Sequence, residues 1–203
     1  DIGCGDGRFL RVLEATGVRR ERLFGIDLDE QTIHSLAQQG YRALCSRVEE
    51  CTEIPDGVLD LVTMFHVLEH VHNPAAVVRR IAQWIVPEGL LAVETPNIDS
   101  LDARLFLSRY WGGYHIPRHW NLFHPASLER LLSENGFTVI STEFQTGHSF
   151  WMFSLHHWLR YGQPPRVRLG QWFHPFHNLP LLVFFTGFDR LRASLGSRTS
   201  AML

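Results

Sequence analysis

The first seven residues, Asp1 to Gly7, constrain the fold of this chain most strongly; they read Asp-Ile-Gly-Cys-Gly-Asp-Gly. Apolar residues at helical spacing follow between Phe9 and Leu13. This pattern predicts a buried strand that passes through a glycine turn into a helix. Glycine lets a ligand approach the backbone closely, and the start of the helix presents unpaired N–H groups. We therefore expect a polar small molecule at this turn, with a plain strand-to-helix turn as the alternative.

The spacing of the glycines separates two classes of nucleotide site. A dinucleotide-binding loop has the pattern G-x-G-x-x-G. Here the pattern is G-x-G-x-G, and Arg8 stands where the third glycine would fall. This difference disfavours a nucleotide-dependent oxidoreductase.

Further apolar runs alternate with helical patterns along the chain. The predicted strands are Leu23–Asp27, Tyr41–Cys45, Leu59–Phe65, Leu90–Glu94 and Phe137–Phe144. Strands that alternate with helices in this way predict a parallel α/β sheet with right-handed crossovers.

Asp27 ends the second predicted strand, about twenty residues after the glycine turn, where a carboxylate can accept hydrogen bonds from ribose hydroxyls. The alternative is that it caps the next helix, which begins near Glu30. Asp29 is better placed for that cap, so we expect Asp27 to bind a ligand.

Composition indicates one globular domain. The chain has 203 residues, of which 45% are apolar and 20% charged. Its cysteines, Cys4, Cys45 and Cys51, form no C-x-x-C pair, which favours reduced thiols and a cytoplasmic protein. The modest net charge of −2 argues against a nucleic-acid partner.

Several segments in order resemble class I S-adenosylmethionine (SAM)-dependent methyltransferases. Besides the glycine turn these are Leu68–Pro74, the run from Pro87 to Asn97 and the Leu-Leu-x-x-x-Gly-Phe segment at 131–137. They are most similar to the small-molecule branch that includes ubiquinone-pathway and sugar O-methyltransferases. The resemblance covers residues 1 to about 145.

The resemblance implies a Rossmann-like seven-stranded sheet of order 3-2-1-4-5-7-6, with strand 7 antiparallel and helices on both faces. Residues 1–203 would form a single domain. The chain opens inside a strand signal and ends in another, near Ser200–Leu203, so we expect both terminal strands to be clipped. The implied cofactor is SAM, with S-adenosylhomocysteine as product. The implied reaction is O-methylation of a small or lipid-linked hydroxyl, a sugar or a quinone-like phenol.

The resemblance also implies which residues surround the cofactor. These are Asp1, Gly3, Cys4, Gly5, Gly7, Asp27, Leu28, Ser46, Arg47, Val48, Phe65 and His66. Ser46 is a departure, because the family usually places an acid there, near the adenine amino group. That departure keeps open a non-catalytic binding or scaffold protein of the same fold. His66 replaces an acid of what looks like a divalent-metal site in related quinone methyltransferases, so no metal is expected.

A lid-like insertion is expected at about 98–123, because aromatic, histidine and glycine residues crowd there. The expected substrate contacts are Trp111, Tyr114, Arg118 and His119. His115 or His119 is the candidate base, since imidazole titrates near neutral pH. A structural flap is the alternative.

An aromatic-rich helical segment is expected at about 149–195. Its apolar run, from Leu179 to Phe188, is too short to span a bilayer. Three interpretations are open for this run: core, the face of a homodimer, or a helix on a membrane surface beside Arg190 and Arg192.

Overall fold

The computed structural model describes residues 1–106 and 109–203. The chain divides into two compact units. Unit 1 is Asp1–Val93 with Leu131–Phe137, and unit 2 is Glu94–Arg130 with Thr138–Leu203.

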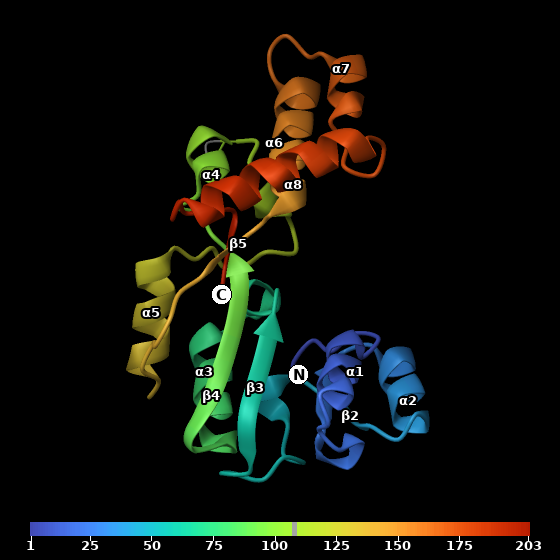
Figure 1. Ribbon diagram of the computed structural model, residues 1–203, viewed down its shortest axis with the longest axis vertical. Helices are drawn as coiled ribbons and strands as arrows, with labels where there is room; N and C mark the ends of the chain where they lie inside the picture. Colours follow the sequence, from blue (N-terminus) through green and yellow to red (C-terminus); the bar gives the residue numbers. More distant parts are fainter. Residues whose placement is uncertain (107–108) are drawn as a thin grey trace. The chain divides into compact units, whose positions relative to one another are not determined.

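Unit 1 alternates strands and helices as the sequence predicts (Figure 1). Its elements are α1 (Arg8–Ala15), η1 (Arg20–Arg22), β1 (Phe24–Asp27), α2 (Glu30–Gln38), β2 (Arg42–Cys45), η2 (Val48–Glu50), β3 (Leu59–Phe65), η3 (Leu68–His70), α3 (Pro74–Trp84) and most of β4 (Ile85–Pro96). This confirms the α/β class.

The strands of unit 1 fix where the glycine turn lies. β1 pairs in parallel with β2, with Asp27 opposite Cys45, and β3 lies beside β4. Ile2 makes single parallel bridges to Ile26 of β1 and to Met64 of β3. The glycine turn therefore leaves the sheet between the carboxyl ends of β1 and β3.

A hydrophobic cluster holds α1 and α2 against β1. Its buried members are Cys4, Leu10, Leu23, Ile33, Leu36 and Tyr41. Leu10 is the buried residue of α1, and Ile33 and Leu36 are those of α2. Because this cluster lies directly beneath the glycine turn, it anchors the turn to the sheet.

Unit 2 is mainly helical. Its elements are the end of β4, α4 (Leu101–Phe106), η4 (Gly112–Tyr114), the start of α5 (Pro125–Glu134), β5 (Phe144–Gln145), α6 (His148–Tyr161), α7 (Val167–Trp172), α8 (Leu179–Ser194) and β6 (Ala201–Met202). β6 pairs antiparallel with the end of β4 and with β5. Helix α6 contacts both α7 and α8, and α8 crosses α6 (Figure 1).

Two predicted strands have different bounds in the structure. The strand expected over Phe137–Phe144 was wrong for most of its length, because β5 begins only at Phe144. Its partner β6 is two residues long, so pairing extends only one position further, where Glu143 and Leu203 exchange backbone hydrogen bonds of 2.8 Å. The strand expected over Leu90–Glu94 is longer, since β4 begins at Ile85 and passes through Glu88 in a left-handed backbone conformation.

Helices α6, α7 and α8 occupy the region where the helical segment at about 149–195 is expected. Within the described residues, no helix combines the length and the apolar character that crossing a membrane requires. The described strands lie in two sheets of two and four strands, so the seven-stranded order stays a prediction.

Candidate cofactor site

The glycine turn has a backbone that other residues rarely adopt. Gly3, Gly5 and Gly7 have φ values of 68°, 48° and 79°, all in the left-handed region. A Cβ on Gly3 would lie 2.3 Å from Val67 Cγ2, and one on Gly7 would lie 2.4 Å from Leu36 Cδ2. A Cβ on Gly5 would meet no heavy atom within 4 Å. Gly3 and Gly7 therefore pack against the protein, whereas Gly5 faces open space.

Asp27 lies against this turn. Its Oδ2 accepts a hydrogen bond of 2.9 Å from the Gly5 N–H, and its Oδ1 accepts from the N–H groups of Leu28 and Asp29. The next helix is capped by Asp29, whose Oδ1 accepts from Thr32 N–H at 2.8 Å. The prediction that Asp29 is the cap is confirmed. The side-chain carboxylate of Asp27 instead lies at the open side of the turn, at the carboxyl end of β1.

Asp1 lies on the other side of the turn. Its Oδ1 accepts a hydrogen bond of 2.9 Å from Thr63 Oγ1, on the neighbouring strand β3. Thr63 carries no motif in the sequence, so its role in orienting Asp1 emerges only from the strand pairing.

Cys4 contributes to the turn through its backbone. Its side chain is buried in the hydrophobic cluster, where a Cβ on Gly25 would lie 2.8 Å from Cys4 Sγ. Burial, and then the charge of Asp27, raise the pKa of the Cys4 thiol to about 11. The thiol is thus neutral and faces away from the open side of the turn.

The residues expected near the adenine follow β1 and β2. Leu28 is exposed, and Ser46 N–H donates to Asp27 O at 3.3 Å, so both lie beside Asp27. The Ser46 hydroxyl donates to Arg47 O at 2.9 Å. Val48 is buried, so only its backbone is available to a ligand, whereas Arg47 is exposed. Ser46 thus offers a hydroxyl at the position where the family usually has an acid.

Phe65 and His66 end β3. The Phe65 ring packs edge-on against Phe9 of α1, with 5.1 Å between the ring centres. His66 has a φ of 55°, and its Nδ1 lies 3.2 Å from Oε1 of the buried Glu69. A left-handed conformation in a non-glycine residue is uncommon and concentrates at functional sites. The sequence places Glu69 three residues after His66, which brings the two side chains to one face of a helical turn, but it did not include Glu69 among the expected cofactor residues.

Unit 2 holds the residues expected in the lid, and Trp111 is not on its surface. The Trp111 side chain is fully buried, and its Nε1–H donates to Asp102 Oδ2 at 2.8 Å. Tyr114 packs edge-on against it at 5.7 Å. The expectation that Trp111 forms a substrate wall is therefore wrong, because the indole fills the core of unit 2. Arg118 is exposed on the loop that follows η4.

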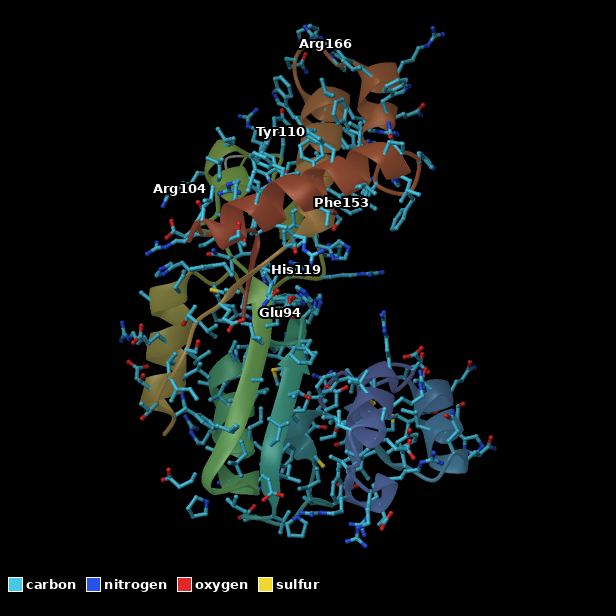
Figure 2. All side chains as sticks on the ribbon, viewed as in Figure 1. Glu94, Arg104, Tyr110, His119, Phe153 and Arg166 are labelled. Atoms are coloured by element: carbon cyan, nitrogen blue, oxygen red, sulfur yellow. The ribbon has the colours of Figure 1, made fainter. Side chains whose placement is uncertain are left out.

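A backbone contact sets which nitrogen of the neutral His119 ring carries the proton (the residue is labelled in Figure 2). Its Nδ1 lies 2.6 Å from Gly113 O, and because a carbonyl only accepts, Nδ1 carries the proton of the neutral ring. The lone pair is then on Nε2. The His115 ring meets that of His119 edge-on at 5.1 Å, and His115 has a φ of 38°.

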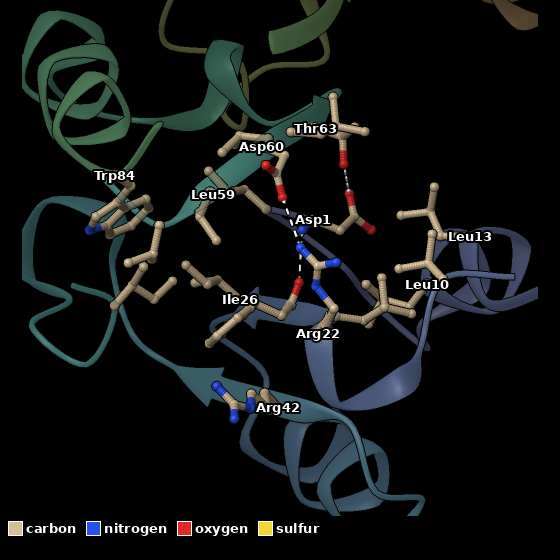
Figure 3. Close-up of a pocket in the computed structure, with 18 of the residues that line it drawn as sticks. Asp1, Leu10, Leu13, Arg22, Ile26, Arg42, Leu59, Asp60, Thr63 and Trp84 are labelled. Atoms are coloured by element: carbon tan, nitrogen blue, oxygen red, sulfur yellow. Dashed lines mark hydrogen bonds and ion pairs between the residues drawn. The ribbon is translucent and has the colours of Figure 1, made fainter. Parts of the chain in front are cut away.

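Unit 1 also holds a cavity of about 660 Å³ that runs along β1 and β3, and Figure 3 shows residues that line it. Its lining includes Leu59 and Asp60, which begin β3, and Trp84. Ligands of open α/β sheets bind outside the carboxyl ends of the strands. The lining extends from Leu59 and Asp60 as far as Asp1 and Thr63, but it includes neither Gly5 nor Asp27. The cavity is therefore distinct from the open side of the glycine turn.

Comparison with known proteins supports this arrangement. Residues 1–142 match the family described as "Methyltransferase domain". Two relatives named "Ubiquinone biosynthesis O-methyltransferase" are 30% identical over 164 residues (Neisseria meningitidis serogroup C; 73% of this chain, 66% of the relative) and 29% identical over 164 residues (Thiobacillus denitrificans; 74% and 67%). The chain thus spans about two thirds of the length of these relatives.

A solved structure, a SAM-dependent methyltransferase from Archaeoglobus fulgidus, is 28% identical with a TM-score of 0.58. The alignment covers 71% of this chain and 62% of that one. With the glycine turn and Asp27 in place at the carboxyl ends of the strands, these matches lead to one conclusion: the chain belongs to the methyltransferase domain family.

Proposed function

We propose that this protein transfers a methyl group from SAM to a hydroxyl of a small or lipid-linked acceptor, a sugar or a quinone-like phenol. One observation carries the proposal: the Asp27 carboxylate accepts from Gly5 N–H at the one glycine of the turn that faces open space. The names of the relatives support an oxygen as the methyl acceptor.

The described residues fit this cofactor. Asp27 offers two carboxylate oxygens for the ribose hydroxyls, and the open side of Gly5 admits a ligand next to the backbone. Leu28 offers an exposed apolar surface to adenine, and Ser46 offers a hydroxyl in place of the usual acid. Bound SAM would supply a methyl group activated by its sulfonium. The protein's part is mainly to align donor and acceptor.

His119 is our candidate for the group that accepts the proton of the acceptor hydroxyl. Its support is the hydrogen bond from Nδ1 to Gly113 O, which leaves the lone pair of the neutral ring on Nε2. Arg118 and Tyr114 are proposed to contact the acceptor, as the sequence suggests, and His115 is the alternative candidate for the base.

We also propose that residues 1–203 form one methyltransferase domain with the strand order 3-2-1-4-5-7-6. Ile2 forms parallel bridges to both Ile26 and Met64, which supports placing the segment that contains Ile2 as strand 1 of that order. A cytoplasmic location is proposed from the three free cysteines.

The test is calorimetric titration of the chain with S-adenosylhomocysteine and, separately, with NAD. Binding of the former alone is expected. Asp27→Asn should weaken it at least about tenfold, the effect of a lost charge-assisted hydrogen bond. Asp6→Asn is the matched control, because Asp6 is an exposed acid of the same turn. Absence of binding would refute the cofactor assignment, and binding without turnover of any phenol or sugar acceptor would favour the non-catalytic alternative.

A further inference from the structure

Helix α8 has an apolar face on the outside. The exposed positions Pro180, Val183, Phe184, Gly187, Leu191 and Leu195 follow one another at helical spacing, so they form one stripe along the helix, which we call the α8 stripe. Phe184 is 62% exposed and Leu195 is 74% exposed. A soluble helix normally directs its apolar stripe inward. The α8 stripe is therefore an unusual surface.

The opposite face of α8 is already committed to the core of unit 2. Phe185 stacks on Trp151 of α6, with 5.9 Å between ring centres, and Phe188 meets the same indole edge-on. Asp189 is fully buried and accepts from Trp151 Nε1–H at 2.9 Å. A small rotation of α8 cannot bury the stripe without breaking these contacts.

The segment that leads into α8 also carries exposed aromatic residues. Phe176, in the turn before α8, is 84% exposed, and Trp172, at the end of α7, is 68% exposed. Aromatic side chains with one polar edge, such as tryptophan, favour the boundary between hydrocarbon and water.

The segment that carries the α8 stripe is rich in arginine. Residues 146–203 contain six arginines and one acid, Asp189. That acid is buried and its Oδ1 lies 3.0 Å from Arg192 NH1. Arg190 borders the stripe, and Arg166 lies in the turn that joins α6 to α7 (Figure 2). Arg192 pairs with Asp189 and Arg198 pairs with Asp99, and the exposed charged side chains of residues 146–203 are all arginines.

The apolar stripe and the arginines of its segment together indicate which partner covers the α8 stripe. In a two-fold dimer the same patch meets itself, so the arginines of one copy would face those of the other, with the segment's one acid buried. A membrane surface with anionic headgroups offers both a hydrocarbon layer for the stripe and counter-charges for the arginines. We propose that the α8 stripe docks this protein on an anionic lipid bilayer.

The use of this surface rests on the proposed function, because a lipid-linked acceptor is presented at a bilayer, whereas docking itself does not depend on methyl transfer. The inference also selects one of the three interpretations that the sequence left open for this run. It requires no spanning helix, since the stripe lies in the plane of the interface.

The experiment is co-sedimentation of the full chain with vesicles of phosphatidylcholine alone and of phosphatidylcholine with phosphatidylglycerol at about 7:3. Binding to the anionic vesicles is expected, weakened when salt is raised from about 0.1 M to about 0.5 M. Val183→Ser and Phe184→Ser should each reduce binding about tenfold, because each removes an apolar side chain from the interface. Arg190→Gln should reduce it less and flatten the salt dependence.

Two matched controls accompany these variants. Ile140→Ser removes an apolar side chain that is 81% exposed in unit 2 but outside α6–α8. Arg109→Gln removes an exposed arginine that precedes η4. Both should bind vesicles like the wild type.

Three results would overturn the proposal: wild-type protein that stays in the supernatant with both vesicles, Phe184→Ser that binds as the wild type does, or a dimer that Phe184→Ser dissociates while vesicles bind neither form. The last result would assign the stripe to a second copy. S-adenosylhomocysteine titration of the same samples separates the two hypotheses. If the wild type binds S-adenosylhomocysteine but not vesicles, only the docking surface is refuted. If the wild type does not bind S-adenosylhomocysteine, the proposed function is refuted.

Discussion

Asp102 and Asp189 contact the same hydroxyl group. Ser200 Oγ lies 2.8 Å from Asp102 Oδ1 and 3.0 Å from Asp189 Oδ2, and both carboxyl groups are fully buried in unit 2. A hydroxyl has one proton, so it donates to only one of them at a time. The second contact is a hydrogen bond only if that carboxyl group is itself protonated.

We expect the proton to lie on Asp102. Asp189 Oδ1 lies 3.0 Å from the Arg192 guanidinium and accepts a hydrogen bond from Trp151 Nε1–H. Asp102 faces no cation among its described contacts. Burial raises the pKa of Asp102, the charge of Asp189 adds to this, and hydrogen bonds from Ser100, Trp111 and Ser200 oppose it. With the proton on Asp102, that group would donate to Ser200 Oγ and Ser200 would donate to Asp189, whereas ionised Asp102 can only accept from Ser200.

This arrangement predicts that Asp102 makes folding weaker as pH rises. Its pKa in the folded protein lies above its ordinary value of 3.8, so the folded state binds a proton that the unfolded chain has released. Its contribution is complete below that ordinary value and is lost as pH rises through the raised pKa. Asp99, whose pKa is lowered by Arg104 and Arg198, has the opposite slope. Chemical unfolding across this pH range measures the sum.

Asp102→Asn isolates the contribution of Asp102. An amide can accept from Trp111 Nε1–H through its oxygen and donate to Ser200 through its nitrogen, so the variant mimics the protonated acid. We expect it to match the wild type within about 1 kcal/mol at low pH and to become relatively more stable as pH rises.

Asp189→Asn is the matched comparison for that variant. It leaves Arg192, whose side chain is 15% exposed, beside a neutral group, and should cost on the order of 3 kcal/mol at neutral pH. Equal losses for Asp102→Asn and Asp189→Asn at neutral pH would contradict the assignment of the proton.

Sequence patterns predicted unit 1 far better than unit 2. β3 begins and ends where the apolar run Leu59–Phe65 does, and Asp29 caps α2 as its position suggested. These features depend on neighbouring residues, which the sequence displays directly. The glycine turn and Asp27 were predictable for the same reason, because strand ends bring them to one edge.

Unit 2 depends on contacts between residues far apart in the chain. The bond from Trp111 to Asp102 turns an aromatic residue of the expected lid into core, and Ser200 joins both to Asp189 of α8. No local pattern marks such a network. One signal was present: Asp189 is the only acid after Glu143, within an apolar helix, and a lone acid in that setting is usually buried with partners.

The glycines of the turn should respond differently to the same substitution. Gly5→Ala meets only the cost of a left-handed φ, about 1–2 kcal/mol, because no atom lies near its new methyl group. Gly7→Ala adds a clash with the buried Leu36 and should cost about 2–4 kcal/mol. In thermal unfolding Gly7→Ala should therefore have the lower midpoint. In titration with S-adenosylhomocysteine, Gly5→Ala should lose affinity although it folds. Normal affinity in Gly5→Ala would show that the ligand does not approach that face.

His119 should control the pH dependence of methyl transfer. His119→Ala is expected to lower kcat by about 10²–10⁴ and to remove the acidic limb of the pH profile, because a general base must be neutral to act. Imidazole in the buffer should restore part of the rate. His34→Ala is the control, because His34 is an exposed histidine of α2 that the proposal assigns to neither the cofactor nor the acceptor. An unchanged pH profile in His119→Ala would rule out its role as base and leave alignment as the main contribution.

The three cysteines should label at very different rates. Cys45 is exposed at the end of β2, whereas Cys4 and Cys51 are buried, and burial raises the pKa of both buried thiols, that of Cys4 to about 11. Because the thiolate is the reactive form, iodoacetamide near neutral pH should alkylate Cys45 alone until the protein unfolds. Cys45 also pairs with Asp27 in the β1–β2 register, so S-adenosylhomocysteine bound at Asp27 should slow its alkylation. Peptide mass spectrometry over time measures both effects. NAD is the control ligand, and equal protection by NAD, or none by S-adenosylhomocysteine, would count against a SAM site at this edge of the sheet.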